Sequence, residues 1–207
     1  MRVPKPAAGA RILSFGGYQP GNVVTNDDLA AVLDTNDAWI RSRVGVASRR
    51  IAGPDETVAD MAVAAAGKAV AGSGVPVSDI DLVVVATCSA ESLIPNVSAT
   101  VAARLGIAAP GAYDLNAACA GFCYALASAS DTIRAGTARH VLVIGAEKMS
   151  AWIDPADRST RIIFADGAGA AVVGPVGSPP RRLRPTARPA PVARCGPFPW
   201  TWDRKNR

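Results

Sequence analysis

A single thiol, Cys119, stands where the sequence changes from a strand pattern to a helix pattern. Residues 112–116 are typical of a short buried strand. From Cys119 to Ser130 there is no charged residue, and seven of the twelve side chains are Ala, Gly or Ser. A helix of this kind is stable only when it is packed on all sides. Because Arg134 and then Gly136 end the pattern, the sequence predicts a buried helix that begins at or beside Cys119.

A thiol at the first turn of a helix is placed for nucleophilic chemistry. The helix N-terminus carries partial positive charge and unpaired N–H groups, which favour a thiolate. The same groups can hold an oxyanion formed by attack on an acyl carbon. The residues alone leave a second interpretation open, in which Cys119 is a small buried apolar side chain. Cys123, four residues later on the same helical face, is interpreted as a second core-facing residue.

Three segments, in order and in register, resemble the β-ketoacyl-acyl-carrier-protein synthase III family. They are residues 34–52 (DTNDAWIRSRVGVASRRIA), 114–126 (DLNAACAGFCYAL) and 164–174 (FADGAGAAVVG). The resemblance runs from about Ala10 to about Gly174 and covers the first half of the family only. It implies a thiolase-like fold and an acyltransferase that primes fatty acid or polyketide synthesis.

The resemblance implies that Cys119 accepts an acyl group from acyl-CoA for condensation with malonyl-acyl carrier protein. No cofactor is permanently bound in this family, since the coenzyme A thioester is a substrate. The condensing step needs a His and an Asn from the family's second half, and His140, the one histidine, does not match that motif. We interpret His140 as a surface residue. The chain is therefore expected to be truncated and to take up an acyl group at most.

The resemblance also implies where coenzyme A and the acyl chain would bind. Trp39 would stack on the adenine, Arg158 would pack against the opposite face of the base, and Arg43 would help to hold the nucleotide end. Thr35 is a further candidate there, and Ile94 would limit the starter chain across a homodimer. The residues alone allow plainer roles: a core anchor for Trp39, solvated positions for both arginines, an N-cap for Thr35, and a plug over the chain's own core for Ile94.

The elements needed to position these residues follow an α/β pattern. The continuous apolar run 81–87 is typical of a strand covered on both faces, as in a parallel sheet. Further strands are predicted at 11–15 and 141–146, with helices at 57–71 and 97–105. We predict one βαβαβ half of a thiolase-like fold, with a mostly parallel mixed sheet and a buried central helix carrying Cys119. Without the other half, that helix would show an apolar face to water.

Composition divides the 207 residues into a leader (1–10), a half domain (11–177) and a tail (178–207). The tail holds eight of the 22 basic residues, one of the 17 acidic residues and seven prolines, so its charge of +7 accounts for the net +5 of a chain whose remainder is slightly acidic. This composition is typical of disorder. Four irregularly spaced cysteines and one histidine favour neither a disulfide framework nor a metal site. We expect a cytoplasmic protein with no membrane span and no nucleic-acid partner.

Two other functions remain open. The chain could be a non-catalytic remnant or interaction module that docks on an intact synthase or a carrier protein. It could also be an enzyme resembling thiolase or hydroxymethylglutaryl-CoA synthase, which share the fold and the cysteine. The helix with Trp39 and Arg43 and the sequence motif ACAGF favour the synthase III family.

Overall fold

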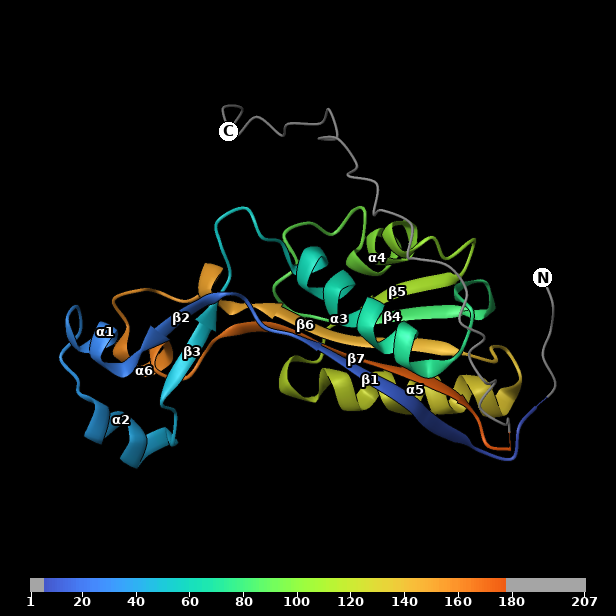
Figure 1. Ribbon diagram of the computed structural model, residues 1–207, viewed down its shortest axis with the longest axis horizontal. Helices are drawn as coiled ribbons and strands as arrows, with labels where there is room; N and C mark the ends of the chain where they lie inside the picture. Colours follow the sequence, from blue (N-terminus) through green and yellow to red (C-terminus); the bar gives the residue numbers. More distant parts are fainter. Residues whose placement is uncertain (1–5, 178–207) are drawn as a thin grey trace.

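The computed structural model describes residues 6–177, in which helices cover both faces of a five-stranded sheet (Figure 1). The strands lie in the order β1 (Ala10–Tyr18), β7 (Asp166–Pro175), β6 (Val141–Lys148), β4 (Leu82–Ala86) and β5 (Gly111–Leu115). β4 pairs in parallel with β5 and β6, whereas β7 is antiparallel to both β6 and β1. Four strands therefore point one way, which confirms the predicted mixed sheet. The tail 178–207 lies outside the described residues.

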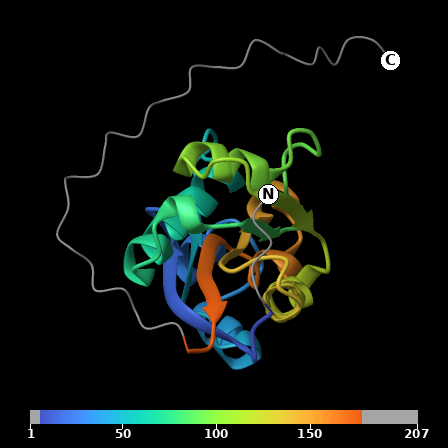
Figure 2. The same ribbon diagram turned by 90° about the vertical axis from the view of Figure 1, so that its right-hand side faces the viewer.

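Strand β4 shows why its apolar run is continuous. Val83 and Val85 belong to the core under α3 (Val58–Ser73) and α4 (Val97–Leu105). Val84 and Ala86 point to the other face and pack with α5 (Gly121–Ala135). Figure 2, which looks along the sheet, shows α3 and α4 on one side of the strands and α5 on the other. The prediction of a strand covered on both faces is confirmed.

Helix α5 is buried along one stripe. Gly121, Ala125, Ala129 and Ile133 form this stripe and repeat every fourth residue against the sheet. Tyr124 is 59% exposed, and Cys123 is also exposed. The prediction of a core-facing Cys123 is wrong, because this residue lies about 200° around the helix from Gly121. In this chain α5 is not packed on all sides, and it turns one side to solvent, as expected for one half of a thiolase-like fold alone.

A small lobe extends from one end of the sheet (Figure 1). Its two-stranded sheet pairs β2 (Asn22–Thr25) with β3 (Ser48–Ile51), and α1 (Asn26–Ala30), α2 (Asp37–Val44) and α6 (Arg158–Arg161) surround this pair. Helix α1 begins with a capping box between Thr25 and Asp28, and α2 ends at Gly45 in the left-handed conformation. Both features are local signals that can be read directly from the sequence.

His140 is buried, not at the surface as predicted. It directly precedes β6, and its backbone N–H donates to Asp81 Oδ2 at 3.1 Å. Its ring Nδ1 lies 3.0 Å from the carbonyl oxygen of Asp79. The reason for the error is that residues 79–81, directly before β4, lie beside the start of β6, where the Asp79 carbonyl is a polar partner for the imidazole.

Strand β1 packs closely against α3, the longest described helix at 16 residues. A Cβ atom at Gly16 would lie 2.1 Å from the carbonyl oxygen of Ala65 and 2.5 Å from the amide nitrogen of Ala69. A Cβ atom at the neighbouring Gly17 would meet nothing within 4 Å. Within residues 6–177, no helix has the length and apolarity to cross a membrane.

We expect Gly16→Ala to lower the free energy of unfolding by about 2 kcal/mol or more, because the clash is with backbone atoms that cannot turn aside. Gly17→Ala is the matched control and should change it by less than about 0.5 kcal/mol. Urea denaturation of both variants measures the difference. Equal effects would contradict the close β1–α3 contact.

Candidate active site

Cys119 lies in a single 3-10 turn, Ala118–Ala120, that leads directly into α5. The predicted position of the thiol beside the start of this helix is confirmed, and the thiol is exposed. The preceding residue, Ala118, has a φ of 45°, in the left-handed region that residues other than Gly adopt rarely. Strained backbone of this kind persists where the surrounding structure enforces it and is frequent at functional sites.

Small residues hold this turn against the sheet. A Cβ atom at Gly121 would lie 3.1 Å from the Cβ atom of Ala86 on β4. A Cβ atom at Gly145 on β6 would lie 3.2 Å from the Phe122 ring. The start of α5 is therefore fixed against two parallel strands at their carboxyl ends, where the sites of α/β proteins usually lie.

A cavity of about 300 Å³ opens beside Cys119. Its lining comes from the carboxyl ends of β4 and β6, from the start of α5 and from Gly167, Ala168 and Gly169 of β7. Among residues 6–177 no N-cap side chain bonds to the 3-10 turn or to α5, and only the Ala118 N–H donates to a side chain, Asn116 Oδ1, at 3.4 Å. Other backbone N–H groups at this helix end can therefore serve an oxyanion. The cavity brings a nucleophile and these N–H groups together, which is the arrangement needed for acyl transfer.

Glu147, which the sequence reasoning missed, also lines this cavity. Its Oε1 accepts a hydrogen bond of 2.8 Å from the Cys88 backbone N–H, and its Oε2 accepts one from the Ser89 hydroxyl. The Ser89 hydroxyl in turn accepts a bond of 2.8 Å from the backbone N–H of Lys148. Glu147 thus fixes the loop that follows β4. The sequence did contain a signal for Glu147, because an acidic residue at the carboxyl end of a predicted parallel strand lies where α/β sites usually form.

The same carboxylate influences a second thiol, Cys88. This side chain is exposed, and its Sγ lies 4.0 Å from the Sδ atom of Met149. Partial desolvation, and then a hydrogen bond to Glu147 and the charge of that carboxylate, raise the pKa of the Cys88 thiol above its ordinary value. Cys88 is thereby kept in the thiol form, which is the less nucleophilic form.

Trp39 and two arginines meet on the small lobe. The Cζ atom of Arg158 lies 4.7 Å from the centre of the Trp39 ring, and the Cζ atom of Arg43 lies 5.7 Å from it. Arg158 Nη1 also donates to the carbonyl oxygen of Asp34 at 2.7 Å. The three residues that the resemblance grouped around the adenine are thus neighbours, although Arg158 comes from α6 and the other two from α2.

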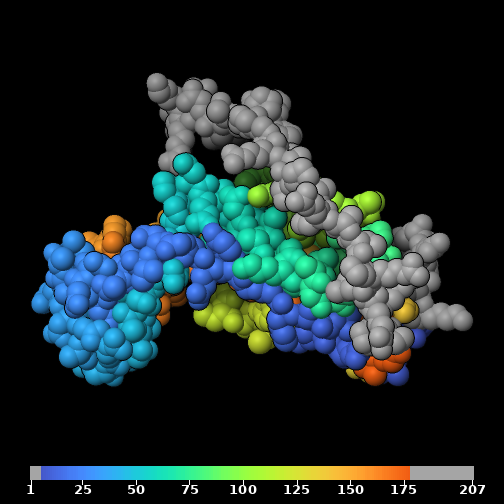
Figure 3. Space-filling model, in the orientation of Figure 1, coloured from blue at the N-terminus to red at the C-terminus, as the bar shows by residue number. Residues whose placement is uncertain are grey.

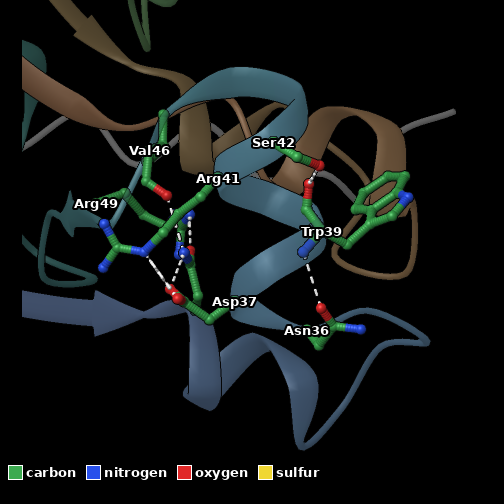
Figure 4. Close-up of polar contacts among 8 residues, drawn as sticks. Asn36, Asp37, Trp39, Arg41, Ser42, Val46 and Arg49 are labelled. Carbon is green, nitrogen blue, oxygen red and sulfur yellow. Dashed lines mark hydrogen bonds and ion pairs between the residues drawn. The ribbon is translucent and has the colours of Figure 1, made fainter.

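Figure 4 shows how α2 presents the Trp39 ring. The ring points to one side of the helix, and Asp37 and Arg41 form an ion pair of 2.7 Å on the opposite side. Asn36 Oδ1 accepts a hydrogen bond of 2.8 Å from the Trp39 backbone N–H. Asn36 is therefore the N-cap of α2, and the N-cap role considered for Thr35 is wrong. The Thr35 hydroxyl is buried without a hydrogen-bond partner among the described residues.

Ile94 is 88% exposed and its neighbour Leu93 is 89% exposed. A side chain this open does not cover the chain's own core, so that interpretation of Ile94 is wrong. Its role across a homodimer stays a prediction.

Trp39 and Ile94 are both absent from the lining of the Cys119 cavity. In Figure 3 the outline of the molecule is notched between the small lobe, in blue, and the yellow-green atoms of α5. The aromatic cluster and the thiol therefore occupy separate places, on the lobe and at the sheet.

The model of the family 3-oxoacyl-[acyl-carrier-protein] synthase III matches residues 113–186. Among curated relatives, the chain is 57% identical over 165 residues to "Beta-ketoacyl-[acyl-carrier-protein] synthase III 2" of Streptomyces avermitilis, covering 80% of this chain and 52% of the relative. It is 51% identical to a synthase III of Vibrio parahaemolyticus, with the same coverage. The chain thus spans about half the length of these relatives.

Solved structures agree with this result. The priming β-ketosynthase of the R1128 polyketide biosynthetic pathway is similar with a TM-score of 0.81 and 46% identity, over 86% of this chain and 53% of that one. The 3-oxoacyl-[acyl-carrier-protein] synthase III of Aquifex aeolicus has a TM-score of 0.80 and 43% identity, over 82% and 55% of the two chains. The thiolase-like fold expected from the sequence is confirmed.

We expect Glu147→Gln to lower the pKa of Cys88, because the amide keeps the shape of the side chain and removes its negative charge. Cys88 should then be alkylated by iodoacetamide at a lower pH than in the wild-type chain. Peptide mass spectrometry across a pH series measures this, with the exposed Cys123 as the internal control. An unchanged Cys88 profile would contradict the influence assigned to Glu147.

Proposed function

The chain belongs to the β-ketoacyl-acyl-carrier-protein synthase III family over about half of that family's length, and on this premise we propose that Cys119 accepts an acyl group from acyl-CoA. The observation that carries the proposal is the position of the thiol. It is exposed in a strained turn, beside a cavity and directly before the uncapped start of α5. A merely structural cysteine would need none of these features.

The proposed step is attack of the Cys119 thiolate on the thioester carbonyl of acyl-CoA. A bond forms between Sγ and the acyl carbon, and the electron pair of the carbonyl moves to its oxygen. Backbone N–H groups at the start of α5 would stabilise this oxyanion. When the carbonyl re-forms, the bond to the coenzyme A sulfur breaks and the coenzyme A thiolate leaves. The cavity beside Cys119 would hold the acyl group.

Condensation with malonyl-acyl carrier protein is proposed for the complete family fold and not for this chain alone. Within residues 6–177, the one imidazole is His140, which is buried against Asp79 and does not line the Cys119 cavity. The general acid–base and enolate-stabilising groups of a condensing step would have to come from another source. The complete reaction, a homodimer with Ile94 at the partner's acyl pocket, and the choice between fatty acid and polyketide priming are parts of this proposal.

The Trp39 cluster would receive the nucleotide end of coenzyme A. An indole face suits stacking with a purine, and guanidinium groups suit phosphate oxygens. The Cζ atom of Arg158 lies 4.7 Å from the centre of the Trp39 ring, which means that the guanidinium stacks directly on the indole. In this arrangement no base fits between the two groups. An adenine would enter after the Arg158 side chain swings outward, which would break its bond to the Asp34 carbonyl.

A second candidate, an interaction module without catalysis, is supported by exposed apolar side chains. Leu93 is 89% exposed, Ile94 88% and Tyr124 59%. Leu93 and Ile94 are neighbours in the loop between β4 and α4, and two adjacent exposed apolar side chains of this size suit contact with a partner. The partner would be an intact synthase subunit or a carrier protein.

Incubation of the full chain with acetyl-CoA should place one acetyl group on Cys119, detected by peptide mass spectrometry. Cys119→Ala should abolish this acylation, whereas Cys123→Ala, which removes an exposed thiol on α5, should leave it intact. An unmodified Cys119 in folded protein would contradict the enzyme proposal and favour the interaction module.

Trp39→Ala should raise the acetyl-CoA concentration needed for half-maximal acylation by about tenfold, the effect of losing one base–aromatic stack. Acetyl-pantetheine, which lacks the nucleotide, should acylate the variant and the wild-type chain equally. Phe15→Ala, which removes another exposed aromatic ring on β1, is the control and should change neither reaction. If Trp39→Ala weakened acylation by acetyl-CoA and by acetyl-pantetheine to the same degree, the result would argue against adenine stacking.

A further inference from the structure

A second cavity, separate from the one beside Cys119, lies within the small lobe. It has a volume of about 310 Å³ and is bounded by the β2–β3 pair, by α1 and by the segment 150–164. This volume is at the lower end of the range for small-molecule sites. None of its lining residues lines the Cys119 cavity or belongs to the Trp39 cluster. The proposed acyl transfer makes no use of it.

The lining of this cavity combines two cations with apolar walls. Arg49 and Arg161 are among its ten lining residues, which include no acidic side chain. Six of the ten are apolar: Val24, Leu29, Ile51, Ile153, Pro155 and Phe164. Two positive groups in a mainly apolar wall attract an anion more strongly than the same groups would in water.

Arg49 is the unusual member of this wall, because its side chain is buried, with a residue exposure of only 4%. Its Nη2 donates to Asn26 Oδ1 at 2.8 Å and to the Ile162 carbonyl at 3.3 Å, and its Nη1 donates to the Val24 carbonyl at 3.3 Å. All of these acceptors are neutral. The Nε–H is buried and has no acceptor among residues 6–177.

The buried guanidinium has no carboxylate in direct contact among the described residues; Asp37 is linked to it through Asn26, whose Nδ2 donates to Asp37 Oδ1 at 2.8 Å. Among the described residues no carboxylate forms an ion pair with Arg49 or with Arg161, whose Nη1 donates to the Pro155 carbonyl at 2.9 Å. The carboxylate of Asp166 is engaged elsewhere, by the Ala52 N–H at 2.7 Å and by the N–H and hydroxyl of Ser150. Burial lowers the pKa of Arg49 from its ordinary value, and the group still stays charged.

We propose that this cavity binds a small amphiphilic monoanion, a carboxylate carried on an apolar group of a few carbons, between Arg49 and Arg161. A carboxylate accepts hydrogen bonds from guanidinium groups in a well-defined planar geometry. The six apolar side chains would surround the carbon chain, and the spare Nε–H would gain an acceptor. Inorganic phosphate would satisfy the arginines alone and leave the apolar walls unused.

The test uses the full chain with hexanoate as the probe, at constant ionic strength. Hexanoate should raise the melting temperature and shift the Arg49 Nε–H resonance in a ¹⁵N-labelled sample, whereas neutral hexanamide should do neither. Arg161→Gln should weaken hexanoate binding by about tenfold or more, since it removes one charged hydrogen-bond donor. Arg49 itself is not substituted, because its three bonds hold the lobe together.

Two control variants separate this site from the rest of the molecule. Arg134→Gln removes an exposed arginine at the end of α5 and should leave hexanoate binding unchanged. Cys119→Ala should also leave it unchanged, which distinguishes this cavity from the proposed acyl site. Equal binding of hexanoate and hexanamide, equal binding of hexanoate and phosphate, or full binding by the Arg161 variant would each overturn the proposal.

Discussion

The structure depends on how closely α5 approaches the sheet. Contact between Gly121 and Ala86 and between Phe122 and Gly145 leaves little space for larger side chains at the glycine positions. These contacts hold the start of α5 at a short distance from the carboxyl ends of β4 and β6. The tight turn directly before it gives Ala118 a positive φ and places Cys119 at the cavity. The chemistry of the thiol is therefore a consequence of packing small residues against parallel strands.

Much of the fold could be predicted because local patterns and burial agree. The apolar run of β4, the capping boxes of α1 and α3 and the glycine stops of α2 and α5 are all local signals, and all appear in the structure. Cys119 was found in the same way, from a helix whose composition excludes charge. The errors at Cys123 and His140 concern which way a side chain faces, and this depends on partners that lie far away in the sequence.

The sites that the sequence did not reveal share one property: each is made by segments that only the tertiary structure brings together. Glu147 gains its role from a loop almost sixty positions earlier. The cavity between Arg49 and Arg161 exists because the β2–β3 pair meets the segment before β7. An isolated arginine in a sequence resembles any solvated surface residue, and nothing local shows that Arg49 is buried without a carboxylate in direct contact.

The small lobe is closed by bonds between residues more than a hundred positions apart. Arg49 Nη2 reaches the carbonyl of Ile162, the Ala52 N–H reaches Asp166, and Arg158 reaches the carbonyl of Asp34. During synthesis the first part of this lobe leaves the ribosome early, yet it has to wait for the second part before its arginines find their acceptors. Long-range closure of this kind is slow. The lobe therefore closes only after the strands and helices that separate its two parts have been synthesised, as does the pairing of β1 with β7.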